Sequence, residues 1–253
     1  MFDHDMNAFV AAVQESLEEA GVGEIKDELH KLLTSYDVED PALILRLRHA
    51  VELILTELIK LERVLRQKAH EHQWTVMTAR THGQVALPST FGQLLLVYSC
   101  AIGRSTRRLR HVIDEELGEA KMSGAVGNYA GMNPALEKYA LEFLGLRPAM
   151  AETQILQRDR HAALVSNLAI MAGTIEQICF TFWLLMQEEV HELQEPRAAG
   201  KRDSSFMPQG ESISAKHSHN YHWPKMMREP HWKSLAKNHW RNVLTSSLIS
   251  RRG

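Results

Sequence analysis

Apolar residues recur along three long stretches of the chain at the spacing of a helix face. In the first stretch, from Pro41 to about Glu71, apolar positions are separated by four and three residues in alternation. The same rhythm returns after Pro88 and again from about Asp159 to Glu195. Steps of three and four place all members of a series on one face of a helix. The pattern therefore predicts three long helices and an all-α fold.

The predicted buried stripes share this heptad spacing, with Ser105 as the one polar intruder in the second stripe. They are Leu47, Val51, Ile54, Leu58, Leu61 and Leu65; Phe91, Leu95, Tyr98, Ile102, Leu109 and Val112; and Leu164, Leu168, Met171, Ile175, Ile178, Phe182 and Leu185. Further apolar residues, such as Leu53, Val97 and Phe180, flank the stripes. Three helices cannot cover these extra faces, so we expect a long-helix bundle that is completed by other subunits.

Polar residues and glycines gather in four connections, at residues 30–40, 78–89, 121–134 and 200–210. The sequence shows no strand alternation of any length and no repeat beyond the heptads. Loops on a rigid scaffold are where binding and catalytic groups usually lie. These four connections are therefore the expected place of the functional residues.

The composition is that of a packed protein rather than a disordered or collagen-like one, with 44% hydrophobic and 24% charged residues in 253. Cys100 and Cys179 are the only cysteines, too few for a disulfide framework or a zinc module. Residues 1–9 are polar and acidic, and no apolar run approaches the roughly 18 residues that a membrane helix needs. We expect a cytoplasmic protein with no membrane contact.

Charge divides the chain near Gly210. Residues 1–209 carry 21 Lys and Arg against 29 Asp and Glu, whereas residues 210–253 carry 8 against 2 and three of the five tryptophans. Three histidines at 217, 219 and 222 suggest a metal site and the basic, Trp-rich composition suggests nucleic acid, but no metal-binding or nucleic-acid-binding motif supports either. A poorly ordered appendage is the favoured interpretation, with a bundle domain at 41–209 and a separate helical part at 1–40.

Two of the connections carry groups that suit an anionic ligand. The segment 78–84 holds an arginine, two threonines, a histidine and a glutamine between two apolar helices. Its structural alternative is a hydrogen-bonded turn in which Gly83 relieves backbone strain. The second segment, Thr34-Ser35-Tyr36-Asp37, is typical of a helix start capped by Ser35 or Asp37, although hydroxyls and free amides at such a start also bind anions.

Six segments occur in the order and at the spacing found in adenylosuccinate lyases of the fumarase and aspartase superfamily. They are "HDMNAF", "LTSYDVEDPAL", "TVMTARTHGQVALPSTFGQ", "KMSGAVGNYAGM", "TQILQRDRHA" and "GKRDSSFMPQ". The resemblance extends over residues 3–209. It implies a helical-bundle lyase that needs no metal and no cofactor, forms a homotetramer and builds each active site from three subunits.

The resemblance also implies a reaction and a substrate. Adenylosuccinate, and in some relatives a succinylated carboxamide ribotide, loses fumarate by β-elimination in purine nucleotide biosynthesis. A base removes a proton next to a carboxylate, and the C–N bond of the resulting carbanion then breaks. Because that proton is only weakly acidic, preorganised donors must stabilise the negative charge that develops.

The family's motifs imply roles for individual residues. His82 matches the general acid that protonates the departing nitrogen, and Ser205 matches the general base on a mobile loop. The implied substrate-binding residues are His4, His30, Thr34, Ser35, Thr81, Gln154 and Ser204. Taken singly, His4 and His30 are also readily explained as surface histidines. The run from Arg158 to His161 is either an ion-pair network at a subunit contact or a set of substrate groups.

The sequence departs from the family pattern in the fourth connection, at residues 200–210. The signature Ser-Ser-x-Met-Pro-x-Lys-x-Asn-Pro begins at Ser204, but Gly210-Glu211-Ser212 replaces its Lys-x-Asn part. About sixty residues at the front of the family pattern and its C-terminal domain have no counterpart either. These departures favour, as an alternative, a catalytically dead paralogue that acts as a structural or regulatory subunit. A sister enzyme, such as an argininosuccinate lyase or a carboxymuconate cycloisomerase, is a further alternative.

Overall fold

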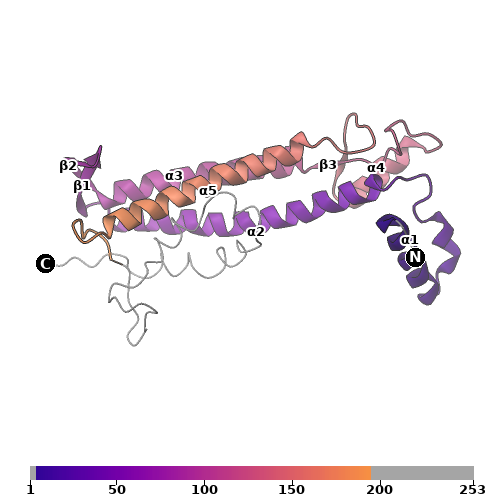
Figure 1. Cartoon of the computed structure of the whole chain (residues 1–253), viewed down its shortest axis with the longest axis horizontal. Coiled ribbons are helices and arrows are strands. Elements are labelled where there is room, and N and C mark those ends of the chain that lie inside the picture. Colours follow the sequence, from indigo (N-terminus) through magenta and orange to yellow (C-terminus); the bar gives the residue numbers. More distant parts are fainter. Residues whose placement is uncertain (1–3, 195–253) are drawn as a thin grey trace. The chain divides into compact units, whose positions relative to one another are not determined.

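The computed structural model describes residues 4–194, and most of this part of the chain is helical (Figure 1). The helices are α1 (Asp5–Glu19), α2 (Tyr36–Glu71), α3 (Phe91–His111), α4 (Pro134–Phe143) and α5 (Asp159–Leu185), with a 3-10 helix at Gly23–Glu28 and a π-helical turn at Val112–Glu116. The strands are β1 (Val76–Thr81), β2 (Gln84–Thr90), β3 (Glu119–Ala120) and β4 (Arg147–Pro148). The mainly helical class predicted from the sequence is confirmed.

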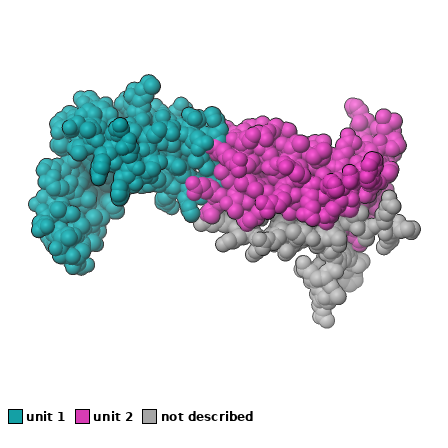
Figure 2. All heavy atoms as spheres, turned by 180° about the vertical axis from the view of Figure 1, so that it is seen from behind, with its two compact units in different colours: residues 1–51, 111–164 teal, residues 52–110, 165–253 magenta. Residues whose placement is uncertain are grey.

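The chain forms two compact units, each made of two separate stretches of sequence (Figure 2). Of the described residues, unit 1 comprises 4–51 and 111–164, and unit 2 comprises 52–110 and 165–194. Unit 1 therefore holds α1, α4, both short strands and most of the loops. Unit 2 holds most of α2, α3 and α5, together with the β1–β2 hairpin. The three domains expected at 1–40, 41–209 and 210–253 stay a prediction.

Unit 2 is built around the apolar stripes that the heptad spacing predicts. The predicted stripe residues that are buried on its three long helices are Ile54, Leu58, Leu61, Leu65, Phe91, Leu95, Tyr98, Ile102, Leu109, Met171, Ile178, Phe182 and Leu185. Helix α3 contacts both of its neighbours, because the Ser99 hydroxyl donates to the Glu62 carbonyl at 3.4 Å and the Tyr98 hydroxyl donates to Thr181 Oγ1 at 2.6 Å. Each large apolar side chain buried in this way contributes about 1.5–3 kcal/mol.

The ends of two predicted helices differ from the expectation. The first helix begins at Tyr36 rather than Pro41, because the Asp37 carboxylate accepts the Thr34 amide at 2.8 Å and so caps the chain earlier. Pro41 then lies inside the second turn, where its fixed φ still suits a helix. The third helix ends at Leu185 rather than near Glu195, because the chain turns back and the amides of Glu192 and Leu193 both donate to the Leu185 carbonyl.

The expectation of no strands was wrong for the connection that carries His82. Strands β1 and β2 pair antiparallel, and Thr81 lies opposite Gln84. The two residues between them, His82 and Gly83, have φ angles of +54° and +72°. Two consecutive residues of positive φ form the tight turn that matches the twist of a hairpin, and His tolerates this region better than most residues. The alternative of a hydrogen-bonded turn in which Gly83 relieves backbone strain is therefore correct in part. The turn is present, but it joins two strands of a hairpin.

Helix α5 differs from the expectation that no segment is long and apolar enough to cross a membrane. By length and composition it is apolar enough to cross a membrane. The expectation missed this because polar residues such as Ser166 and Glu176 interrupt the apolar sequence, although the helix as a whole is apolar. Core helices of soluble proteins pass the same test, and α5 buries Met171, Ile178 and Phe182 within unit 2.

Candidate active site

The Thr34–Asp37 segment at the start of α2 is fixed by its own hydrogen bonds. Asp37 Oδ2 accepts the Thr34 amide at 2.8 Å, and the Asp37 amide donates back to the Thr34 carbonyl at 3.0 Å. Ser35 contributes its carbonyl, which accepts the amides of Val38 and Glu39. Of the two predicted capping residues, Asp37 is the one whose side chain binds a backbone amide. The hydroxyl-bearing pair Thr34 and Ser35 thus sits on a rigid helix start.

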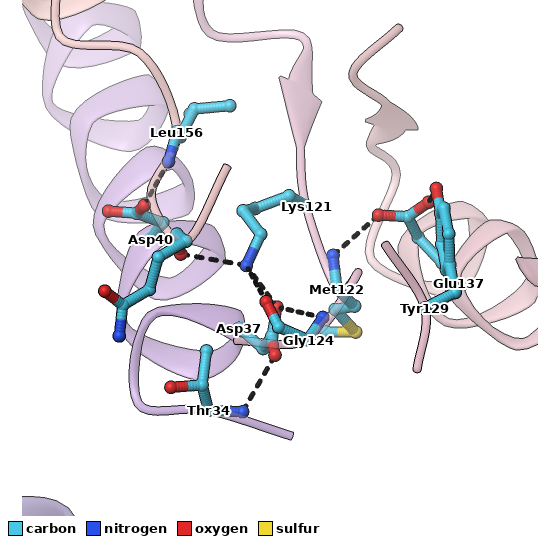
Figure 3. A network of polar contacts seen from close by, with 10 residues as sticks. Thr34, Asp37, Asp40, Lys121, Met122, Gly124, Tyr129, Glu137 and Leu156 are labelled. Carbon is cyan, nitrogen blue, oxygen red and sulfur yellow. Dashed lines mark hydrogen bonds and ion pairs between the residues drawn. The ribbon is translucent and has the colours of Figure 1, made fainter. Parts of the chain in front are cut away.

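A buried lysine joins this segment to two others (Figure 3). Lys121 Nζ is 2.6 Å from Asp37 Oδ1 and donates to the carbonyls of Gln154 at 2.9 Å and Gly124 at 3.2 Å. The side chains of Lys121 and Asp37 are 1% and 0% exposed. Since an ammonium group has three hydrogens, these three acceptors satisfy it completely. Asp37 Oδ1 also accepts the Gly124 amide at 3.3 Å.

A second aspartate, one helical turn further along α2, holds the segment that follows Gln154. Asp40 Oδ2 accepts the Leu156 amide at 2.7 Å, and Asp40 Oδ1 pairs with Arg158 Nη1 at 2.7 Å. The Arg158 guanidinium also lies over the Tyr36 ring, 5.6 Å from its centroid. Asp37 and Asp40 are three residues apart and so share one face of α2. Asp40 fixes the Leu156 amide, and Asp37 holds the lysine that binds the Gln154 carbonyl, whereas Gln154 itself is exposed.

Arg158 and Arg160 belong to an ion-pair network within the chain. Arg160 Nη2 is 2.8 Å from Glu119 Oε2 and 3.9 Å from Glu152 Oε1. Burial raises the pKa of Glu152, against the opposing effect of Arg160. Burial also lowers the pKa of His161, with the Arg158 charge acting in the same direction. These contacts support the ion-pair interpretation of the 158–161 run, while its contact with another subunit stays a prediction.

The loop after Lys121 is shaped by glycines and by a buried glutamate. Glu137 Oε1 accepts the Met122 amide at 2.7 Å, and Glu137 Oε2 accepts the Tyr129 hydroxyl at 2.5 Å. The hydrogen bond to Glu137 is the main cause that raises the pKa of Tyr129 to about 12. Gly127 has a φ of +76°, and a Cβ there would lie 2.1 Å from the Glu152 carbonyl. Gly127 therefore allows this loop to approach the segment that carries Gln154.

Three side chains in unit 1 have buried polar atoms without a hydrogen-bond partner; Ser123 is buried, whereas His30 and His161 are half-buried. Ser123 Oγ, His30 Nε2 and both ring nitrogens of His161 find no hydrogen-bond partner within residues 4–194. Ser123, which is 4% exposed, follows Lys121 by two residues. His30 has a positive φ of +61°, a strained conformation for a residue other than glycine. Unsatisfied buried groups beside a rigid polar network are suited to donate to, or accept from, a bound ligand.

The remaining predicted site residues are placed as follows. His4 is an exposed N-cap of α1, where its Nδ1 accepts the Met6 amide at 3.2 Å. Thr81 and His82 are exposed at the tip of the β1–β2 hairpin in unit 2. Ser204 and Ser205 lie outside the described residues. Among those described, no three His, Cys, Asp or Glu side chains gather into a group that could hold a metal ion.

Within unit 1 the Asp37–Lys121 pair thus links the backbone of Thr34 to that of Gln154. Ser35 follows Thr34 along the chain, and a common site formed by the three side chains stays a prediction. The sequence analysis assigned no role to Lys121, Asp40 or Glu137. A faint signal was present for the lysine, which is a single charge inside the small and apolar run from Ala120 to Gly127. A charged residue in such a run is buried only when it is paired.

The family of the chain follows from its sequence match. The profile of the family described as "Lyase" matches residues 2–211, which is most of the chain. The chain belongs to this lyase family. Within the family it is similar to adenylosuccinate lyase from Aquifex aeolicus, with 41% identity over 208 residues that cover 82% of this chain and 46% of that protein. Adenylosuccinate lyase from Bacillus subtilis is also 41% identical, over 206 residues covering 81% and 46%.

Solved structures of this lyase fold resemble the chain as well. Fumarate lyase from Mesorhizobium has a TM-score of 0.66 at 27% identity, covering 78% of this chain and 49% of that one. A β-carboxy-cis,cis-muconate cycloisomerase from Acinetobacter calcoaceticus has a TM-score of 0.68 at 28% identity, covering 75% and 44%. The predicted superfamily fold is confirmed. The chain spans just under half the length of the curated relatives that it matches.

Proposed function

We propose that this chain acts as an adenylosuccinate lyase in purine nucleotide biosynthesis. It cleaves adenylosuccinate to fumarate and AMP by β-elimination, and succinylaminoimidazole carboxamide ribotide is its second substrate. The observation that carries this proposal is 41% identity to adenylosuccinate lyases along 82% of the chain. The cycloisomerase alternative is less well supported, because the similar cycloisomerase structure is only 28% identical.

In the proposed reaction, proton transfer is divided between a histidine and a serine. His82 donates a proton to the departing nitrogen, because an imidazole can hold and release a proton near neutral pH. Ser205 removes the proton from the β-carbon after its hydroxyl has been activated by nearby positive charge. Neither role requires a metal or a cofactor.

Neutral donors hold the negative charge that develops on the substrate. Thr34, Ser35, Thr81, Gln154 and Ser204 are the proposed donors, while His30 helps to hold the substrate and His4 lies near the nucleotide phosphate. The rigid backbone around Thr34 and Gln154 supports this assignment, because donors that are already in place need no reorganisation when charge develops. Donors aimed at the charge of the intermediate accelerate the reaction more than donors that bind substrate alone.

The proposed enzyme is a cytoplasmic homotetramer in which different subunits contribute to one active site. Exposed apolar side chains on the three long helices support this assembly. They include Leu53 at 51% exposed, Val97 at 57% and Ile170 at 50%. Such faces are expected where helices of one subunit pack against those of another.

The assay is fumarate formation by the full chain, compared with the variant His82→Asn. Asparagine tolerates the positive φ of position 82 but cannot act as an acid, so we expect turnover to fall about 10²–10⁴-fold with unchanged stability. The matched control is His70→Asn, an exposed histidine on α2. Full activity of the His82 variant would refute the role of His82.

A second candidate function is that of a non-catalytic subunit. The observation that favours it is Gly210-Glu211-Ser212 in place of the family's Lys-x-Asn, where a cation and an amide are expected to bind substrate carboxylates. Losing such a cation costs 10²-fold or more in rate. In this case the protein alone gives no fumarate, whereas mixing it with a complete adenylosuccinate lyase changes the mass or the rate of that assembly. Fumarate formation by the protein alone rules this function out.

A further inference from the structure

The apolar side chains of the hairpin that carries Thr81 and His82 are largely exposed. Val76, Val85 and Leu87 on its two strands are 67%, 75% and 73% exposed. An isolated two-stranded hairpin is only marginally stable in water. The direction in which the turn points must therefore depend on contacts beyond the pairing of β1 with β2.

The base of the hairpin is fixed to the helices on either side. The Phe91 amide donates to the Thr75 carbonyl at 2.9 Å, and the Gly92 amide donates to the His72 carbonyl at 3.0 Å. The His72 ring meets the Phe91 ring edge-on, with 5.6 Å between centroids. A Cβ on Gly92 would lie 2.4 Å from the Ala69 carbonyl, so the start of α3 and the end of α2 are in close contact.

A bulge separates this fixed base from the turn. Thr78 pairs with Pro88, and the next pair toward the turn is Arg80 with Val85. Strand β2 therefore has one more residue than β1 between these two pairs. An extra residue bends the ribbon and increases its twist, so the base alone does not determine the direction of the turn.

Beyond the bulge, a bidentate ion pair holds the hairpin to the segment that follows α5. Arg80 Nη1 is 3.0 Å from Glu192 Oε2, and Arg80 Nη2 is 3.0 Å from Glu192 Oε1. Arg80 Nη1 also donates to the Thr78 carbonyl at 3.2 Å. The two side chains are only 30% and 23% exposed. Paired parallel bonds of this kind fix an angle as well as a distance.

Glu192 itself lies on a rigid segment. Its amide and that of Leu193 both donate to the Leu185 carbonyl at 3.0 Å, and the His191 amide donates to the Gln187 carbonyl at 2.8 Å. Leu193, the next residue, is 4% exposed. The carboxylate therefore has a fixed position relative to α5, and the ion pair transmits this position to the hairpin.

We propose that Glu192 is a positioning residue that, through Arg80, fixes the turn carrying Thr81 and His82. Arg80 precedes His82 by two residues, so a displacement of the backbone at Arg80 also displaces the imidazole of His82. A displacement of about 1 Å at a reacting group lowers a rate by up to about 10²-fold. This inference rests on the proposed role of His82 as the acid. The tether itself can be tested without that role.

The structural test is hydrogen exchange of the full chain over residues 76–90. Glu192→Gln removes the charge and one oxygen, and we expect amides of the hairpin to exchange about three- to tenfold faster. The control Glu57→Gln, which breaks the Glu57–Lys60 pair on α2 in the same unit, leaves these amides unchanged. The exchanged pair Arg80→Glu with Glu192→Arg restores slow exchange to within about twofold. Unchanged exchange in Glu192→Gln, or no restoration by the exchanged pair, would overturn the tether.

The functional test is the steady-state rate of fumarate formation by the same proteins. In Glu192→Gln we expect kcat to fall about 10- to 100-fold while KM changes by less than about threefold, because the acid acts in the transition state. Glu57→Gln keeps the kcat of the unaltered protein. A fall in kcat without faster exchange means that Glu192 acts directly, and faster exchange with full kcat means that the tether does not position His82. Either result overturns the proposal, whereas a protein that forms no fumarate but shows the expected exchange contradicts the proposed function alone.

Discussion

In unit 1, the loops that carry candidate substrate groups are held by charges that are almost completely buried, whereas in unit 2 the His82 hairpin is exposed. Lys121 and Asp37 are 1% and 0% exposed, but Arg80 and Glu192 are 30% and 23% exposed. A buried pair is costly to break because the remaining charge is left without solvent. A partly exposed pair opens at small cost. The loops of unit 1 and the His82 turn of unit 2 are thus both held by ion pairs, but by pairs that differ in burial and therefore in the cost of breaking them.

The strongest test of this comparison is Lys121→Met. It leaves Asp37 buried without its cation and removes the donors to Gln154 and Gly124, so we expect a loss of about 3–5 kcal/mol in the free energy of unfolding. The control Lys138→Met breaks the exposed Lys138–Glu142 pair, which is expected to contribute less than about 1 kcal/mol. Urea unfolding measures both variants. Similar losses for the two variants would show that burial does not distinguish the contacts.

A second test asks whether unit 2 depends on its apolar stripe rather than on charge. Ile102 is 0% exposed on α3, and Ile102→Ala should cost about 2–5 kcal/mol because it leaves a cavity. Val97→Ala on the same helix is the control, since Val97 is 57% exposed. Calorimetry on dilute protein measures the loss of stability in each variant. If the Val97 variant loses as much as the Ile102 variant, the Val97 face is covered by another chain.

The smallest expected effect concerns the Tyr129–Glu137 hydrogen bond and its dependence on pH. Because the pKa of Tyr129 is raised to about 12 in the folded protein, its contribution is complete below the unfolded value near 10 and is lost as the pH rises toward 12. Tyr129→Phe should cost about 1 kcal/mol at pH 8, and the difference from the unaltered protein should shrink above pH 10.

Unfolding by urea at several pH values between 8 and 12 measures this difference. Tyr139→Phe, at a tyrosine that is 74% exposed, is the control and should show no such trend. A difference between the Tyr129 variant and the unaltered protein that stays constant up to pH 12 would contradict the assigned hydrogen bond.

The parts of the fold that depend on local periodicity were predictable from the sequence. Leu65 and Ile102 are completely buried, as their heptad positions indicate. The sequence offered two starts for α2, Pro41 and the Thr34–Asp37 segment, and the helix begins at Tyr36 in the second, where the Asp37 carboxylate accepts the Thr34 amide. The hairpin was missed because its turn uses a histidine in place of the asparagine or aspartate that usually marks such turns.

Residues of the candidate site could be predicted only where they belong to a sequence motif or to a helix start. Thr34, Gln154 and Lys121 all stand in recognisable segments, but nothing in the segment of Lys121 indicates that this lysine joins the other two. The three acceptors of Lys121 come from positions 37, 124 and 154, and no local pattern reveals that such distant positions meet. The assignments of Ser204 and Ser205 stay predictions.

Because Lys121 is completely buried, the reactivity of its amine reports on the opening of the loops around it in unit 1. An amine-reactive reagent modifies exposed lysines such as Lys138 within the native protein, but it reaches Lys121 only in molecules whose surrounding loops have opened. The rate at which the peptide containing Lys121 is labelled therefore measures how often these loops open. A ligand that binds beside Thr34 and Gln154 should slow the labelling of this one amine and leave that of Lys138 unchanged.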